Sequence, residues 1–210
     1  MCFSLQASTI AAASLLTIGG IGVTQHWRKK TILIVATPFI FGIQQLSEAV
    51  IWAQRVLNLS PDIIQAATYT FLFFAYFFWP IWIPTALWYA EPHNQQKKIL
   101  SLTVLAGIVD GCVLLYYLIT TPAHAAIQCA HIIYWIGVPQ AWYLPGMALY
   151  ATATIAPWFI SSIPRMWLAG LILAISYLIS WWFYFAAFAS VWCFFAAILS
   201  ALILVLLDRN

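Results

Sequence analysis

Glu48 is the residue with the most direct chemical potential, because it is an acid inside a long apolar run, residues 31–52. An ionisable side chain within a membrane-spanning helix costs about 2.5 to 3.5 kcal/mol on insertion scales unless it faces protein or water. Gln44, Gln45 and Trp52 lie three or four residues from it and therefore share its side of a helix. We expect this side to face inward, as a catalytic or ligand-binding site about 25 Å along the helix. The alternative is structural, a protonated carboxyl that hydrogen-bonds a neighbouring helix.

Asp110 is the second acid inside an apolar run, residues 99–120. Thr103 and Tyr117 lie seven residues on either side of it, which predicts a polar stripe along one helix face. The glycines three residues before it and one residue after it would let a neighbouring helix approach closely. Counting the helical rise places Asp110 about 10 Å shallower than Glu48, so we expect no direct carboxylate pair. A catalytic role and helix–helix adhesion both remain open for Asp110.

Histidine offers a third candidate group, although no two of the four histidines have the close helical spacing of a zinc motif. His131 opens an aromatic segment, residues 131–135, which also contains Tyr134. We expect this segment to fold over the outer end of the bundle near Glu48. His131 is then the candidate catalytic partner of Glu48, and Tyr134 is a candidate ligand contact.

Three of the four cysteines, Cys2, Cys129 and Cys193, are predicted on the outer surface. An oxidising compartment favours one disulfide among them. No CxxC spacing indicates a metal centre, so none is predicted. Cys2, Cys193 and His131 are the residues that would supply ligands if a metal were bound.

The composition fixes the environment in which these residues act. The chain has 210 residues, of which 65% are hydrophobic and 6% charged, whereas about 25% are charged in soluble domains. A single domain, residues 1–210, therefore lies in a bilayer. The net charge of +3 is spread thinly along the chain and gives no basic face, which excludes a nucleic-acid partner.

The apolar runs predict an all-α fold, a polytopic transmembrane helix bundle with seven spans. These are residues 4–24, 31–52, 63–90, 99–120 and 141–160, and a hairpin within 166–207 that turns near residues 186–190. Pro80 and Pro84 predict a kink in the third span, because proline removes a helix hydrogen bond. Residues 121–140 are predicted as an outer loop with an interfacial segment.

The basic residues orient the bundle, since lysine and arginine beside a span tend to stay in the cytoplasm. Seven spans place Arg55 outside and the other seven inside: Arg28, Lys29, Lys30, Lys97, Lys98, Arg165 and Arg209. The N-terminus is then outside and the C-terminus inside. An eighth span at residues 121–140 is the alternative. It would place Arg165 and Arg209 outside, which leaves five of these eight basic residues inside and three outside.

Several short motifs together carry a resemblance to a known family. They are Met1-Cys2-Phe3-Ser4, Gln44-Gln45-Leu46-Ser47-Glu48 followed by Trp52, Trp79-Pro80, Glu91-Pro92, and Trp192-Cys193-Phe194. Over nearly its whole length the chain resembles a family of uncharacterised bacterial multi-pass membrane proteins that begin Met-Cys-Phe-Ser. The resemblance implies a location in the bacterial inner (plasma) membrane and no particular activity. The family pattern has glycine after the acid where this chain has Ala49, which narrows the space beside Glu48.

Three functions remain open at this point. The first is an enzyme that acts on a lipid or another membrane-soluble substrate, with Glu48, His131 and Asp110 as candidate catalytic residues. The second is a proton-coupled transporter or small-molecule carrier in which the two acids form a relay. The third is a lipid-binding accessory subunit of a membrane complex, in which the acids join helices. Membrane lipids and a small-molecule or lipid ligand are the expected partners, and the sequence specifies neither a cofactor nor an oligomeric state.

Overall fold

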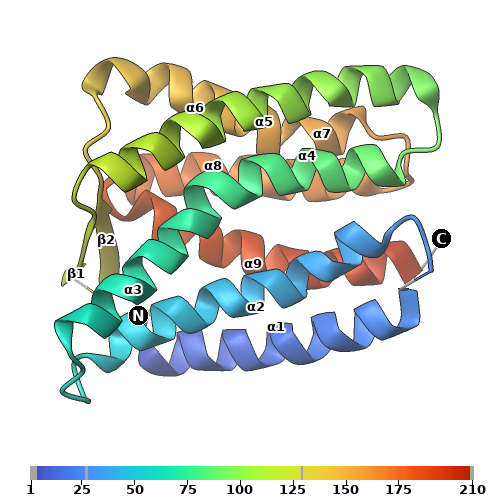
Figure 1. The fold of residues 1–210 in the computed structure, drawn as a ribbon. Helices are drawn as coiled ribbons and strands as arrows, with labels where there is room; N and C mark the ends of the chain where they lie inside the picture. The colour runs from blue at the N-terminus through green and yellow to red at the C-terminus, as the bar shows by residue number, and fades with distance from the viewer. Residues whose placement is uncertain (1–3, 27, 129, 209–210) are drawn as a thin grey trace.

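The computed structural model describes residues 4–26, 28–128 and 130–208, and these form a helical bundle with one small sheet (Figure 1). The first half contains α1 (Leu5–His26), α2 (Ile32–Ala53), α3 (Pro61–Leu72), the π-helical segment η1 (Phe73–Phe78), α4 (Trp79–Ala90) and α5 (Asn94–Thr120). The second half contains β1 (His124–Gln128), β2 (His131–Trp135), α6 (Gln140–Thr154), α7 (Ala156–Ile160), α8 (Met166–Phe183), the 3-10 turn η2 (Phe185–Ala187) and α9 (Phe188–Asp208).

Six helical segments of the described chain are long and apolar enough to cross a membrane, which confirms a polytopic membrane protein. They are α1, α2, the continuous run Pro61–Ala90, α5, α8 and Phe185–Leu204. The predicted fifth span instead forms two shorter helices, α6 and α7, which meet at Ile155. Pro157 follows two residues later. Proline lacks the N–H that would continue a helix hydrogen-bond ladder, and its ring disfavours a helical conformation at the residue before it. A seventh span at residues 141–160 stays a prediction.

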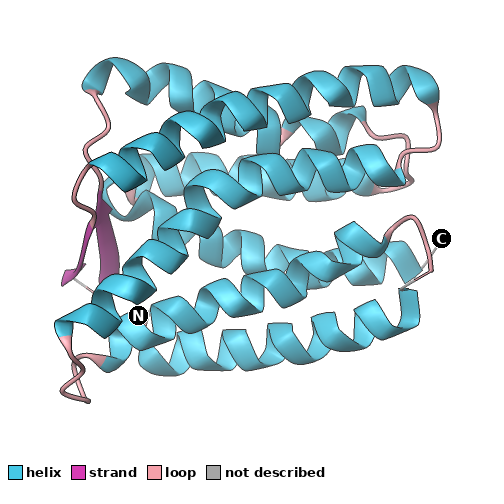
Figure 2. Ribbon diagram, in the orientation of Figure 1, coloured by secondary structure: helices cyan, strands magenta, loops and turns pink. Residues whose placement is uncertain are grey.

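Residues 124–128 and 131–135, predicted to lie in an outer loop, form the two strands of an antiparallel β-hairpin (Figure 2), so the mostly helical fold is not purely α. His124 pairs with Trp135 and Gln128 with His131 at the two ends of the ladder. β2 is rich in β-branched and aromatic residues, which favour strands. Its burial alternates, with Ile132 and Tyr134 turned into the protein, as the two-residue period of a strand requires.

The third span bends one turn earlier than the prolines alone predict. The wide turn η1 precedes Pro80, and in it the N–H of Trp79 bonds the carbonyl of Phe74, five residues back. Pro80 has no N–H to offer to the preceding carbonyls. Figure 1 shows that α3 and α4 run at an angle to each other across this segment.

The α8–α9 hairpin confirms the prediction that residues 166–207 turn back on themselves, but the turn lies at residues 184–187 rather than 186–190. α9 therefore begins at Phe188, and Cys193 lies inside this helix with 3% of its surface exposed. The prediction that Cys193 lies on the outer surface is wrong, because the early turn carries it more than one helical turn into the bundle.

The elements gather at two ends of the bundle. The hairpin and the α8–α9 turn lie at one end, called the hairpin end below, at the left of Figure 1. The C-terminus and the α1–α2, α4–α5 and α7–α8 loops lie at the opposite end. α1 packs against α2, α4 against α5, and α9 against α2, α8 and β2.

Candidate functional site

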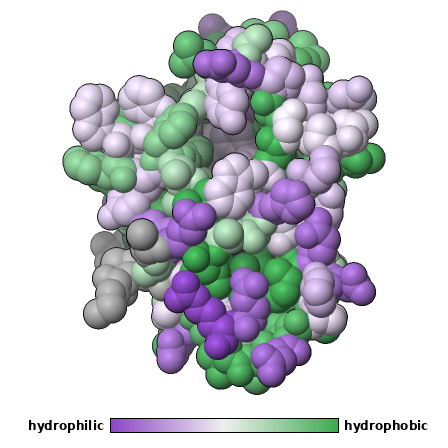
Figure 3. All heavy atoms as spheres, turned by 90° about the vertical axis from the view of Figure 1, so that its left-hand side faces the viewer, coloured by the Kyte–Doolittle hydropathy of each residue, from purple (hydrophilic) through white to green (hydrophobic). Residues whose placement is uncertain are grey.

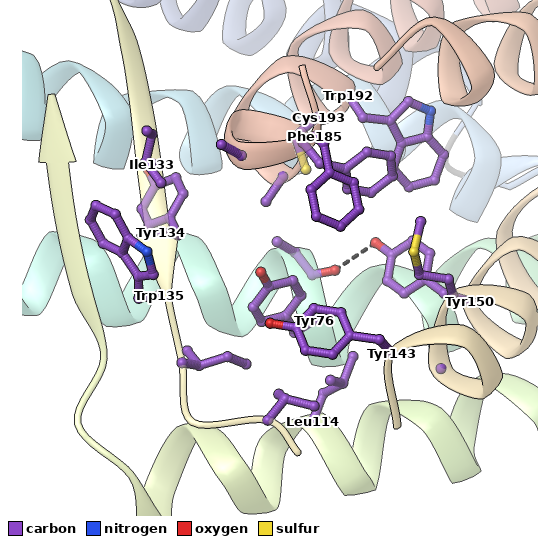
Figure 4. A pocket seen from close by; sticks show the side chains of 18 of the residues that line it. Tyr76, Leu114, Ile133, Tyr134, Trp135, Tyr143, Tyr150, Phe185, Trp192 and Cys193 are labelled. Atoms are coloured by element: carbon purple, nitrogen blue, oxygen red, sulfur yellow. Dashed lines mark hydrogen bonds between the residues drawn. The ribbon is translucent and has the colours of Figure 1, made fainter. Parts of the chain in front are cut away.

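A cavity of about 490 Å³ lies near the hairpin end of the bundle. Its walls come from η1, α5, β2, α6, α8 and α9, so segments from both halves of the sequence meet around it. Figure 3 looks onto this end and shows a hollow between the side chains of its upper half. Figure 4 shows Tyr76, Tyr143 and Tyr150 around the same space, with Trp192 and Cys193 of α9 opposite the strand β2.

Helical periodicity explains why α6 and α9 line this cavity. On α6 the lining residues are Trp142, Tyr143, Gly146, Met147 and Tyr150, and on η2 and α9 they are Phe185, Ala186, Phe188, Ala189, Trp192 and Cys193. Both sets follow three- and four-residue offsets, which gather side chains on one helix face. Each helix therefore presents one aromatic face to the cavity.

Asp110 lies in the wall of the cavity on α5 and is 0% exposed. Neither of its carboxyl oxygens accepts a hydrogen bond from the described residues. The indole of Trp142 lies beside it but forms no hydrogen bond of ordinary geometry. Gly146 leaves room for both groups, since a Cβ there would come 2.8 Å from Trp142 Nε1 and 3.4 Å from Asp110 Oδ1. Asp110 is thus a buried acid in the cavity wall whose carboxyl oxygens have no hydrogen-bond partner among the described residues.

Tyr150 is fixed at the cavity wall by the π-helical turn. Its hydroxyl donates a 2.5 Å hydrogen bond to the carbonyl of Ala75, shown as the dashed line in Figure 4. This carbonyl is available because Trp79 bonds Phe74 instead and Pro80 lacks an N–H. A freed carbonyl at membrane depth needs a partner from the protein, and Tyr150 provides it.

Glu48 is 0% exposed and lies beside the cavity rather than in its wall. Its Oε1 accepts hydrogen bonds from Ser190 Oγ at 2.5 Å and from Tyr134 Oη at 3.5 Å. Its Oε2 has no hydrogen-bond partner within the described chain. Tyr134 also lines the cavity and stacks on Phe71, with ring centroids 4.5 Å apart. Glu48 therefore joins α2, α9 and β2 directly behind the cavity wall.

The other predicted neighbours of Glu48 lie in the core. Gln44 Oε1 accepts a 2.6 Å hydrogen bond from Trp79 Nε1, whereas neither amide atom of Gln45 bonds a described residue. Trp52 is 5% exposed and packs in the apolar cluster, with the Arg55 guanidinium 5.7 Å from its ring centroid. Within the described residues these three side chains do not line the cavity.

The histidine and cysteine candidates do not assemble into one site. His131 stacks on Tyr184 at 5.1 Å, and the residue of this segment that bonds Glu48 is Tyr134. Cys193 lines the cavity and is a free thiol, which excludes it from the predicted disulfide. Cys2 and Cys129 lie outside the described residues. No group of three or more His, Cys, Asp or Glu side chains suitable for a metal occurs in the described part of the chain.

Glu91 is a third fully buried acid, at the end of the bundle opposite the hairpin. It accepts hydrogen bonds from Ser162 Oγ at 2.5 Å, the Ser162 N–H at 2.8 Å, Ser161 Oγ at 3.0 Å and the His93 N–H at 3.1 Å. Burial alone would raise the pKa of Glu91, but these four bonds outweigh burial and hold the pKa below its ordinary value. Glu91 thus joins the α4–α5 loop to the α7–α8 loop.

Comparison with known proteins places the whole sequence in one family. Residues 1–210 match the family of unknown function DUF6629. The chain belongs to this family. No curated protein and no solved structure shows significant similarity to it. The function of this DUF6629 protein therefore has to be argued from its own cavity and buried acids.

Sequence reasoning missed most of the aromatic residues that line the cavity of this DUF6629 member. Tyr143 and Tyr150 lie seven residues apart on α6, with Gly146 and Met147 between them. This spacing was available in the sequence, but tyrosines near span ends are also typical of interfacial belts. Ser190, which bonds Glu48, was missed because it was assigned to the predicted turn.

Proposed function

We propose that this protein is a seven-pass protein of the bacterial inner membrane that binds a membrane-soluble small molecule or lipid in its aromatic cavity. The single observation that carries the proposal is the cavity itself, about 490 Å³ and lined mostly by apolar and aromatic side chains. Ligand sites are typically concave and apolar, with a few convergent polar groups. Asp110 and the hydroxyls of Tyr76 and Tyr143 are the polar groups that we assign to ligand contacts.

The path of the chain supports seven passes. Ser161 and Ser162, directly after α7, hydrogen-bond Glu91 at the end opposite the hairpin. α6 and α7 would therefore together cross the membrane, with a break at Ile155. The basic loops support the orientation, because Arg28, Lys29, Lys30, Lys97, Lys98 and Arg165 belong to the loops or helix starts of this end. In this orientation the N-terminus and the cavity lie on the outer side.

The candidate catalytic residues receive different roles in this proposal. Asp110 would contact the ligand, and it would be the general acid or base if the protein is an enzyme. Glu48 and His131 would position the hairpin that covers the cavity, Glu48 through Tyr134 and His131 through its stacking on Tyr184. Gln44, Gln45 and Trp52 would support Glu48 from α2.

A direct test of this proposal replaces a small residue of the cavity wall by a large one, so that the new side chain occupies the space of the ligand. Ala189 lines it, whereas Ala148 of α6 is exposed. The purified protein in a nonionic detergent should bind the neutral probe N-phenyl-1-naphthylamine saturably. Ala189→Phe should weaken this binding at least about tenfold, which corresponds to 1.4 kcal/mol. Ala148→Phe, a matched enlargement on the outer face, should leave it unchanged. Equal binding by both variants would contradict the assignment of the site.

A carrier is the second candidate, and a second cavity favours it. A space of about 30 Å³ is lined by Tyr150, Trp192 and Cys193, which also line the main cavity. The second space extends between α2, α4, α8 and α9, away from the hairpin. Tyr150 and Trp192, whose ring centroids are 5.4 Å apart, would then form a barrier in a transport path. Uptake into proteoliposomes that rises when Trp192→Ala opens this barrier would support the carrier, whereas binding without uptake would support a receptor, an accessory subunit or an enzyme.

A further inference from the structure

We propose that the ligand of the aromatic cavity is a lipophilic organic cation, a protonated amine or a quaternary ammonium compound, whose charge pairs with Asp110. This inference rests on the proposed function and deepens it. The proposed function requires only that a membrane-soluble molecule occupies the cavity. The inference specifies the charge of that molecule.

The charge distribution in the cavity wall is the first argument. Asp110 is the only carboxylic acid among the described lining residues, and no Lys, Arg or His accompanies it there. Neither carboxyl oxygen accepts a hydrogen bond from the described chain. A buried carboxylate without a paired charge is strongly disfavoured, and a cation bound beside it would supply the missing charge. An anionic ligand would meet the same carboxylate as a like charge.

The aromatic wall is the second and independent argument. Rings of Tyr76, Tyr143, Tyr150, Phe188 and Trp192 surround the space, together with Tyr177 at its side. The negative faces of aromatic rings attract cations, and cages of such rings recognise quaternary ammonium groups. The hydroxyl of Tyr150 is engaged with Ala75, so this side chain contributes mainly its ring to the cavity.

Geometry brings the two features together. Gly146 on α6 faces Asp110 on α5, and a side chain at this position would contact Trp142 Nε1 at 2.8 Å. The absence of a side chain leaves room for the carboxyl and the Trp142 indole between the two helices. Gly146 belongs to the same face of α6 as Tyr143 and Tyr150. A ligand cation at the carboxyl would therefore lie directly beside these rings.

The experiment compares two probes of the same shape, the cation phenyltrimethylammonium and the neutral tert-butylbenzene. Each competes with N-phenyl-1-naphthylamine for the full-length protein in a nonionic detergent. We expect the cation to compete at least about tenfold more strongly, because its charge would pair with Asp110 and lie beside the aromatic rings. Asp110→Asn should abolish this preference, whereas Asp62→Asn, which removes an exposed acid of α3, should retain it.

Each outcome decides between the two proposals. Equal or stronger competition by tert-butylbenzene would overturn the cation inference and leave the binding cavity intact. Failure of the wild-type protein to bind N-phenyl-1-naphthylamine saturably would overturn the proposed function, and the inference with it. A cation preference that survives Asp110→Asn in a folded protein would remove Asp110 from the site. If Asp110→Asn does not fold, the comparison of the two probes on the wild-type protein still decides the sign of the ligand charge, and Asp110→Glu should retain the preference.

Discussion

Glu48 and Asp110 are both fully buried acids in transmembrane helices, but their surroundings differ. Glu48 accepts hydrogen bonds from Ser190 and Tyr134, so its carboxyl joins three elements of the protein. Asp110 accepts none from the described residues and lies in the cavity wall. One carboxyl oxygen of Glu48 is satisfied within the fold, whereas neither oxygen of Asp110 is, and an unsatisfied buried acid points to a function. The hydrogen bonds of Glu48 therefore distinguish it from Asp110, to which we assign the ligand contact in the proposed function.

Glu48 provides the first prediction. Glu48→Gln retains an oxygen that accepts from Ser190 and Tyr134, so the free energy of unfolding should change by less than about 1 kcal/mol. Glu48→Leu leaves both hydroxyls unsatisfied in the core and should lower the free energy of unfolding by roughly 1 to 3 kcal/mol. Thermal unfolding in detergent, followed by circular dichroism, measures both changes. Equal effects of Gln and Leu would contradict a hydrogen-bonding role.

Glu91 provides a prediction on pH. Because the pKa of Glu91 is lowered in the folded protein, the charged carboxylate stabilises the fold above the ordinary pKa of 4.5. This stabilisation is lost as the pH falls from about 4.5 through the lower folded value. Glu91→Gln should lower the free energy of unfolding at pH 7. On acidification, the free energy of unfolding of this variant should then fall less than that of the wild-type protein.

The measurement for Glu91 is the unfolding midpoint of both proteins between pH 7 and pH 3. Asp62→Asn is the matched control, since Asp62 is an exposed acid at the other end of the bundle. It should follow the wild-type pH dependence. Parallel curves for wild type and Glu91→Gln would show that the four hydrogen bonds to Glu91 do not favour its charged form.

At the scale of elements, the contact between α4 and α5 depends on Gly107. A Cβ at this position would collide with the backbone carbonyl of Pro80 and would come 3.3 Å from Ala153 Cβ. Glycine therefore lets α5 pack against the backbone of α4, directly after the π-helical turn. Backbone cannot move aside as the tip of a side chain can, so this approach specifies the angle between the two helices.

Gly107→Ala should accordingly lower the free energy of unfolding by about 1 to 3 kcal/mol or more, because it overpacks a helix contact. Gly20→Ala is the matched control, since a Cβ there meets only Phe39 Cδ2, at 4.0 Å. Alanine has the higher helix propensity by about 1 kcal/mol, so the Gly20 variant should be as stable as wild type or more so. Both values come from thermal unfolding of the two proteins in the same detergent. If the two variants are equally stable, the close approach of α5 to Pro80 is wrong.

At the scale of the whole molecule, the two chain ends lie at opposite ends of the bundle (Figure 1). An odd number of passes follows if both ends are exposed to solvent. We predict that a C-terminal green fluorescent protein fusion fluoresces, because it remains in the cytoplasm, and that a C-terminal alkaline phosphatase fusion is inactive. An alkaline phosphatase fusion after Thr121, before the hairpin, should be active. The reverse pattern would invert the topology and place the cavity on the cytoplasmic side.

The sequence by itself determined the environment and most of the helices. The apolar runs are long and the charges few, and a bilayer accepts only backbones whose hydrogen bonds are internally satisfied. The inward face of α2 also followed from the spacing of Gln44, Gln45 and Glu48, all of which are 0% exposed. Local periodicity sufficed for these features because neighbouring residues determine them. It did not reveal the hairpin, whose strand β2 is too short and apolar to be distinguished from an interfacial segment.

Only the tertiary structure decided which residues meet. Asp110, Tyr76, Tyr143 and Trp192 lie far apart in the sequence and come together because α5, η1, α6 and α9 pack around one space. Likewise, Glu48 accepts a hydrogen bond from Ser190, which lies 142 residues away. Helical periodicity tells which face of a helix is buried, but the partner of that face depends on crossing angles and on contacts such as Gly107 with Pro80. The cavity and the different contacts of Asp110 and Glu48 therefore exist only in the folded bundle.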